Sequence, residues 1–272
     1  MEEEIRICQH TQNLYMTRLK KLFENKQNNI LNIYCTAGYP TLNDTKEIML
    51  LLQNNGVDII ELGIPYSDPL ADGLIIQQSS SVALNNGMSI EILFNQLENF
   101  RNQIHIPVML MGYLNPILQY GFEAFCSQAN KVGIDGLIIP DLPMIEFEEE
   151  YQKIIKQNYL DFIFLITPET SEERINKLDE LSSGFLYAVS SSSTTGSQIN
   201  WVDVKLYLKK LQQMKLKNPI LAGFGVSNKE SFNHVCTYTN GAIVGSAFIK
   251  SLSNSNHSIH SKAKEFISKI LD

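Results

Sequence analysis

Residues 57–78 read VDIIELGIPYSDPLADGLIIQQ, and this stretch determines how the rest of the chain is interpreted. Its first residues, VDIIEL, predict a short strand buried on both faces, as in a parallel sheet, with Glu61 near the carboxyl end. A buried carboxylate is unfavourable without a partner, so Glu61 is expected either to form an ion pair or to take part in catalysis. The following loop carries Asp68 and Asp72, types that also serve as turn residues and helix caps. Strand, acid, rigid loop and helix in this order are typical of an enzyme on a parallel α/β scaffold.

The remaining chain repeats the pattern of a short apolar strand followed by a helical segment. The predicted strands cover 29–36, 59–63, 107–113, 136–139, 161–166, 184–189, 219–222 and 241–244. Thr41, Ser89 and Ser171 are predicted to cap helices. A (β/α)8 barrel typically takes about 250 residues, and this chain has 272. We therefore expect one TIM barrel domain over 1–272, with an extra N-terminal helix near 12–26 that could close the bottom face and extra loop helices; a doubly wound sheet is the alternative.

Composition narrows the function classes. The net charge of −7 argues against a nucleic-acid partner, which favours a basic surface. No apolar run approaches 18 residues, so no membrane span is expected. The four cysteines have no metal-ligand spacing and are expected to be free thiols, with no metal site. The N-terminus lacks the apolar segment of a signal peptide, which favours the cytoplasm, or a plastid stroma if a transit peptide has been removed.

Two glycine loops late in the chain are predicted to bind an anion. GFGVS, with Phe224, Gly225 and Ser227, follows the seventh predicted strand. Gly245 and Ser246 follow the eighth, and Ser227 and Ser246 are each placed to start a helix. Each glycine alone is explained as a turn residue. As a pair after consecutive strands they favour phosphate, because barrels frequently bind phosphate with these two loops and a short helix.

The string ELGIPYSDPLADG resembles the signature of the tryptophan synthase alpha chain family, and GFGVS and GAIVGSAF resemble that family's phosphate loops. The resemblance extends in blocks from about Tyr34 to Phe248. It implies an aldol-type lyase that splits indole-3-glycerol phosphate into indole and glyceraldehyde 3-phosphate, with no cofactor in this chain. It also implies a beta-chain partner that uses pyridoxal phosphate, an alpha2beta2 complex, and transfer of indole to that partner for tryptophan synthesis.

The resemblance also implies roles for single residues. Glu61 and Asp72 match the catalytic acids, and Tyr187 matches an active-site tyrosine, although a packed aromatic explains it equally well. Asp68 matches a loop that faces the beta chain, and Asp141 a loop near the indole tunnel. The positions around the indole and glycerol parts of the ligand are Tyr34, Tyr113, Thr195 and Phe224; those around its phosphate are Gly196, Gly225, Gly245 and Ser246.

The chemistry of the two acids agrees with these roles. Glu61 lies among Ile60, Leu62 and Ile64, so desolvation should raise its pKa and let it shuttle protons. Asp72, in a polar turn, is expected to stay ionised and to accept the indole N–H. Two acids with separated pKa values can share the protonation of C3, the stabilisation of N1 and the deprotonation of the C3′ hydroxyl.

The loop after the sixth predicted strand departs from the family. Ser191 and Ser193 stand where the family commonly has an arginine and a glycine, in a loop that closes over the ligand. Serine cannot replace the hydrogen bonds of a guanidinium. The alternative function is therefore a catalytically weakened barrel that acts mainly as an allosteric activator of the beta chain.

Overall fold

The computed structural model describes residues 17–189, 200–253 and 258–272. Its strand pairs are all parallel and form one sheet in the order β5-β4-β3-β2-β1-β9-β8-β7-β6. The strands are β1 (Ile30–Thr36), β2 (Ile59–Gly63), β3 (Val108–Met111), β4 (Gly136–Ile138), β5 (Asp161–Ile163), β6 (Leu165–Ile166), β7 (Leu186–Val189), β8 (Ile220–Gly223) and β9 (Gly241–Val244).

The sheet closes on itself. β5 and β6 stand at opposite ends of the strand order, yet Phe164 alone separates them in sequence. They are the two halves of the single strand predicted at 161–166, so the first and last members of the sheet lie side by side. The predicted (β/α)8 barrel is confirmed, and the doubly wound alternative is wrong.

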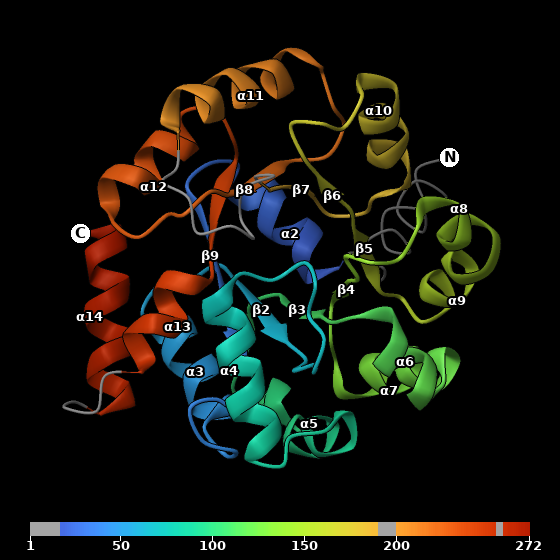
Figure 1. The fold of residues 1–272 in the computed structure, drawn as a ribbon, viewed down its shortest axis with the longest axis vertical. Helices are drawn as coiled ribbons and strands as arrows, with labels where there is room; N and C mark the ends of the chain where they lie inside the picture. Colours follow the sequence, from blue (N-terminus) through green and yellow to red (C-terminus); the bar gives the residue numbers. More distant parts are fainter. Residues whose placement is uncertain (1–16, 190–199, 254–257) are drawn as a thin grey trace, which may run out of the picture.

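Helices surround the ring of strands, and α2 lies across its centre in Figure 1. The helices are α2 (Arg18–Asn25), α3 (Thr45–Asn54), α4 (Leu74–Asn85), α5 (Ile90–Gln96), α6 (Leu114–Tyr120), α7 (Phe122–Val132), α8 (Met144–Glu146), α9 (Gln152–Gln157), α10 (Glu172–Leu181), α11 (Trp201–Gln213), α12 (Lys229–Cys236), α13 (Ser246–Leu252) and α14 (Ile259–Leu271), with a 3₁₀ turn at Phe100–Asn102 and a π-helical turn at Phe147–Tyr151. Among these described helices, none is long and apolar enough to cross a membrane.

The interior of the barrel is filled by one apolar layer and closed by α2. Eight buried side chains form a ring, seven from strands and one, Phe185, from the position just before β7: Ile30, Ile59, Met109, Ile138, Ile163, Phe185, Leu221 and Ile243. Leu19 of α2 joins this layer and is fully buried. Gly184 (φ +109°) permits the approach, because a Cβ there would lie 2.3 Å from the Leu19 side chain. The predicted N-terminal helix therefore closes the barrel at one end. Side chains two residues further along each strand also point inward, toward the open end.

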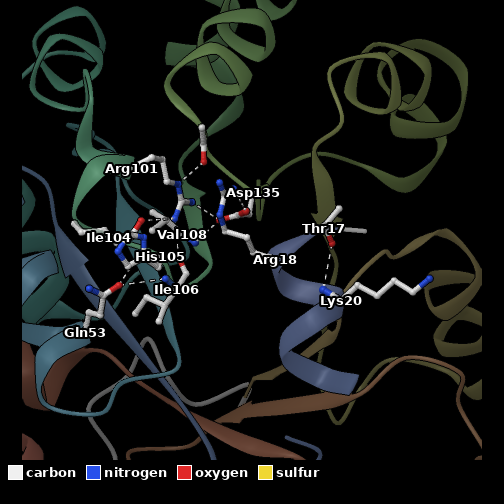
Figure 2. Close-up of polar contacts among 11 residues, drawn as sticks. Thr17, Arg18, Lys20, Gln53, Arg101, Ile104, His105, Ile106, Val108 and Asp135 are labelled. Carbon is white, nitrogen blue, oxygen red and sulfur yellow. Dashed lines mark hydrogen bonds and ion pairs between the residues drawn. The ribbon is translucent and has the colours of Figure 1, made fainter. Parts of the chain in front are cut away.

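An ion-pair network fixes the amino-terminal ends of the strands (Figure 2). The buried Asp135 carboxylate, just before β4, accepts hydrogen bonds from Arg101, from Arg18 of α2 at 3.0 Å and from the Val108 backbone N–H at 2.7 Å. Arg101 also donates to the Ile106 carbonyl at 2.7 Å. The network therefore joins α2 to the segments entering β3 and β4, away from the carboxyl ends of the strands.

Several element boundaries agree with the sequence prediction and some do not. The bounds of β2 and β9 are as predicted, and Ser89 and Ser171 cap their helices. The predicted cap at Thr41 is wrong: Asp44 occupies the N-cap of α3, and its carboxylate accepts from the Thr41 N–H at 2.9 Å. Ser227 does not start α12 either, because Asn228 caps it through a reciprocal pair with Ser231.

Candidate active site

Glu61 lies inside the barrel with no exposed surface, near the carboxyl end of β2. The Asn32 amide of β1 donates to its Oε1 at 2.5 Å, while Oε2 has no hydrogen-bond partner among the described residues. Within the part of the chain that the structure describes, no cation pairs with Glu61, so the ion-pair interpretation is wrong. Burial raises the pKa of Glu61 to about 8, against the opposing effect of the Asn32 hydrogen bond. A carboxyl with this pKa exchanges protons near neutral pH.

Asp72 is the second buried acid, with 8% of its surface exposed. Gly73 occupies the N-cap of α4, so Asp72 is not the helix cap. Burial raises the pKa of Asp72 to about 6, and a hydrogen bond with the Tyr113 hydroxyl lowers it. That hydroxyl also accepts from the Ala71 N–H at 3.0 Å. Asp72 lies in a turn as expected, but its side chain is buried, and its raised pKa remains below that of Glu61.

Two buried phenols, Tyr187 and Tyr34, lie near the acids. Tyr187 of β7 has a pKa raised well above its usual value, by burial first and then by the charges of Glu61 and Asp72. Tyr34 of β1 lies in register with Glu61 across the β1–β2 pair and is buried. Its hydroxyl accepts a long hydrogen bond, 3.4 Å, from Thr36. The fold therefore brings the two acids, which stand close together in sequence, next to phenols from β1 and β7.

The two glycine loops lie side by side because β8 pairs with β9. Gly225 has φ +57°, a conformation that favours glycine. Gly245 is the N-cap of α13, and a Cβ built there would lie 3.5 Å from the Tyr34 Cβ. The second loop is thus adjacent to the acid-bearing end of the barrel. Ser246 is the exposed first residue of α13 and its side chain does not cap the helix, contrary to prediction.

The other predicted residues lie around this centre or outside the description. Phe224 is 2% exposed and packs on Tyr207, with ring centroids 6.0 Å apart. Asp68 is exposed, and the Ser67 hydroxyl donates to its carboxylate at 2.5 Å. Asp141 is exposed and accepts from the Leu114 N–H at 2.9 Å. Thr195, Gly196 and the serines 190–193 lie outside the described residues.

A surface cavity lies apart from this centre, beside the loop that follows β4. None of the predicted catalytic, substrate or phosphate residues lines it; its walls are Ile139, Pro140, Leu142, Met144, Phe164, Leu165, Arg174 and Leu178. The candidate site is therefore defined by the buried acids and not by this hollow.

Sequence reasoning missed Asn32, the partner of Glu61. A signal was present: Asn32 is the one amide within the apolar strand NILNIYCT after its first residue, and it is two positions before Tyr34. Alternation places both side chains on the same face. What the sequence lacks is the register that pairs this strand with β2.

Fold and site together define a closed (β/α)8 barrel that carries buried acids at the carboxyl ends of its strands. Residues 19–270 match the model of the family described as tryptophan synthase alpha chain. The chain is 53% identical over 252 residues to a tryptophan synthase alpha chain of Flavobacterium johnsoniae, covering 92% of this chain and 98% of that one. The chain belongs to the tryptophan synthase alpha chain family.

Solved structures agree with this assignment. The tryptophan synthase subunit alpha of Legionella pneumophila is 32% identical and superposes with a TM-score of 0.86, covering 94% of this chain and 97% of that chain. A chain of Mycobacterium tuberculosis tryptophan synthase in an aminoacrylate-bound form is 28% identical, with a TM-score of 0.81, and the match covers 93% of this chain and 99% of that chain.

Proposed function

We propose that this chain is a carbon–carbon lyase that cleaves indole-3-glycerol phosphate into indole and glyceraldehyde 3-phosphate. The observation that carries the proposal is Glu61: a carboxyl with no exposed surface and no ion partner among the described residues, whose pKa is raised to about 8. Such a group is poised to give and take protons at neutral pH. Family membership supplies the substrate class.

The cleavage divides its proton transfers between the two acids. Neutral Glu61 protonates indole C3. Ionised Asp72 accepts a hydrogen bond from the indole N1–H and so stabilises the positive charge that develops on the ring. The Glu61 carboxylate then removes the proton of the C3′ hydroxyl. The C3–C3′ bond breaks, its electron pair restores the aromatic ring, and the hydroxyl carbon becomes the aldehyde of glyceraldehyde 3-phosphate. The net change transfers one proton from the hydroxyl to C3, so this chemistry requires no metal or organic cofactor in this chain.

The remaining residues bind and orient the substrate. Tyr34, Tyr113 and Phe224 line the indole and glycerol end, and Tyr187, whose pKa is raised by burial and then by the charges of both acids, is the active-site phenol. The phosphate is held by the backbone of Gly225, Gly245 and Ser246, together with Gly196, and Thr195 contacts the glycerol part. The nearness of Gly245 to Tyr34 supports this arrangement, since a Cβ built on the glycine would lie 3.5 Å from the Tyr34 Cβ.

A beta chain that uses pyridoxal phosphate is the proposed partner, in an alpha2beta2 complex that passes indole onward to tryptophan. Asp68 lies on the docking loop, where the neighbouring Leu70 is 87% exposed. We place the complex in the cytoplasm, and the expectation of a single domain over 1–272 stays a prediction.

The alternative function is activation of the beta chain by a barrel with little catalysis of its own. The substitutions at Ser191 and Ser193 favour it. The experiment that separates the two measures indole and glyceraldehyde 3-phosphate released from indole-3-glycerol phosphate, with and without the cognate beta chain. Stoichiometric release of both products, abolished by Glu61→Gln, supports the lyase. No release in either arm, with faster beta-chain turnover when this chain is added, supports the activator.

A further inference from the structure

The contact between Asn32 and Glu61 is enclosed in the barrel interior. Both side chains have no exposed surface, and the amide–carboxylate distance is 2.5 Å. Within the described ranges, each residue also has one oxygen without a partner, Oδ1 of Asn32 and Oε2 of Glu61. Buried polar atoms without partners are uncommon in native proteins and invite an explanation.

Asn32 is a polar side chain at a position where the barrel interior is otherwise apolar. Its register neighbours are Ile59 on β2 and Ile243 on β9, both members of the apolar interior layer. An aliphatic side chain would pack at this position with no unpaired oxygen. The amide therefore serves the carboxyl two residues above Ile59 and not the packing of the layer.

We propose that Asn32 is a positioning residue that holds the Glu61 carboxyl in one orientation in both of its protonation states. When Glu61 is ionised, the Asn32 amide group donates from Nδ2 to Oε1, as the structure shows. When Glu61 is neutral, rotation of the amide by about 180° presents Oδ1 to accept from the carboxyl O–H. One amide thus satisfies an acid that must gain and lose a proton in each turnover, and the inference rests on the proposed function.

No hydrogen bond to the Glu61 carboxyl is seen from the described titratable groups that surround the pair. Tyr34 and Cys35 come from β1, Tyr187 from β7 and Asp72 from the loop after β2. Burial raises the pKa of the Cys35 thiol to about 12, so it stays neutral near pH 8, as do the two phenols, whose pKa values are also raised. The donated amide bond lowers the pKa of Glu61 against the effect of burial. Its loss should therefore raise that pKa further.

The test is the titration of the Glu61 carboxyl by 13C NMR of glutamate-labelled protein, with Glu61→Gln to assign the signal. Asn32→Leu has similar volume and no hydrogen-bonding group. We expect its Glu61 midpoint to rise by about one pH unit, because the amide bond to the ionised carboxylate is roughly twice as strong as the bond to the neutral acid, so its loss disfavours the ionised form more. Ile243→Val, which shortens a side chain in the adjacent strand, should leave the midpoint unchanged.

Activity supplies an independent readout. In Asn32→Leu, kcat for indole release should fall at least tenfold while KM changes little, and Asn32→Ser should recover part of the loss through its hydroxyl. If Asn32→Leu fails to fold, Asn32→Ser takes its place in the titration, with a smaller rise expected. Equal midpoints in the wild type and in the folded Asn32 variant would overturn the inference. If the midpoint shifts in the Asn32 variant but the wild type releases no indole, the role of Asn32 stands and the proposed lyase function is rejected.

Discussion

Gly63 leaves open the space that the Tyr34 side chain fills. A Cβ built on Gly63 would lie 2.1 Å from the Tyr34 hydroxyl oxygen and 2.4 Å from its ring carbon Cζ. Tyr34 lies two residues after Asn32 on β1, and Gly63 lies two residues after Glu61 on the neighbouring strand β2, so both are toward the carboxyl ends of their strands. The glycine in the ELGIPYSDPLADG string therefore has a steric reason: it admits a large phenol next to the buried acid.

Gly63→Ala should accordingly displace Tyr34. We expect it to lower the free energy of unfolding by about 1–3 kcal/mol, the usual effect of overpacking, and to reduce indole release. Urea unfolding measures the first effect. In a Tyr34→Leu background the same substitution should have a smaller effect, because the shorter side chain leaves room. Equal effects of Gly63→Ala in both backgrounds would show that the two side chains do not compete for the space.

Glu61→Gln should make the protein more stable at alkaline pH. Burial raises the pKa of Glu61 from 4.5 to about 8 in the folded state. Folding therefore favours the neutral form: the wild type has its full stability below the unfolded pKa and loses it progressively as the pH rises through the folded pKa. A shift of this size corresponds to a difference on the order of a few kcal/mol above pH 8.

Urea unfolding of both proteins from acidic to alkaline pH measures this difference. Near pH 4 the two should be almost equally stable, and the gap in favour of Glu61→Gln should widen as pH rises. If the difference in stability does not depend on pH, the pKa of Glu61 is the same in the folded and unfolded states, and burial does not raise it.

Gly245→Asp should weaken binding of glycerol 3-phosphate far more than it changes folding. The new carboxylate would stand at the start of α13, where the phosphate is proposed to bind, and like charges repel. Gly245→Ala is the matched control, because a Cβ there meets its nearest atoms, of Ile76 and Tyr34, at an ordinary 3.5 Å. Calorimetry should show near wild-type affinity for the alanine variant and a large loss for the aspartate variant. Similar affinities for the two would place the phosphate elsewhere.

Asp135→Asn should destabilise the barrel without altering its chemistry. It leaves the Arg101 guanidinium, 14% exposed, without its anion, a loss of about 3 kcal/mol for a buried pair. Arg18 pairs with the same carboxylate but is 45% exposed, so Arg18→Ala should lower stability by only about 1 kcal/mol or less. Unfolding in urea compares the two, and indole release per folded molecule should stay at the wild-type level. If Arg18→Ala lowers stability more than Asp135→Asn does, the exposed Arg18 pair contributes more than the account assigns to it.

Local sequence signals predicted much of the barrel. β2 and β9 were placed correctly because each is a clear apolar run with a distinct boundary. The break at Phe164 was missed: DFIFLI is uninterrupted in sequence, and the division into β5 and β6 depends on closure of the sheet. Thr41 and Asp44 are both good caps, and only the path of the loop selects Asp44.

The site was predictable in its residues but not in its contacts. The acids stand in one string, and the raised pKa of Glu61 was expected from its apolar neighbours. Burial of Asp72 was not, because it depends on Tyr113, a residue on the loop that follows the next strand. The pairing of Asn32 with Glu61 likewise requires the β1–β2 register. Such contacts join segments that no local pattern relates.

The central claim, that Glu61 and Asp72 divide the proton transfers of one cleavage, is tested most directly by the pH dependence of kcat/KM for indole release with saturating beta chain. The reaction begins with neutral Glu61 and ionised Asp72, whose pKa values are about 8 and about 6. We predict a bell-shaped profile with its maximum between these values, and loss of the acidic limb in Asp72→Asn. A profile that is flat across this range, or one that keeps its acidic limb in Asp72→Asn, would contradict the account.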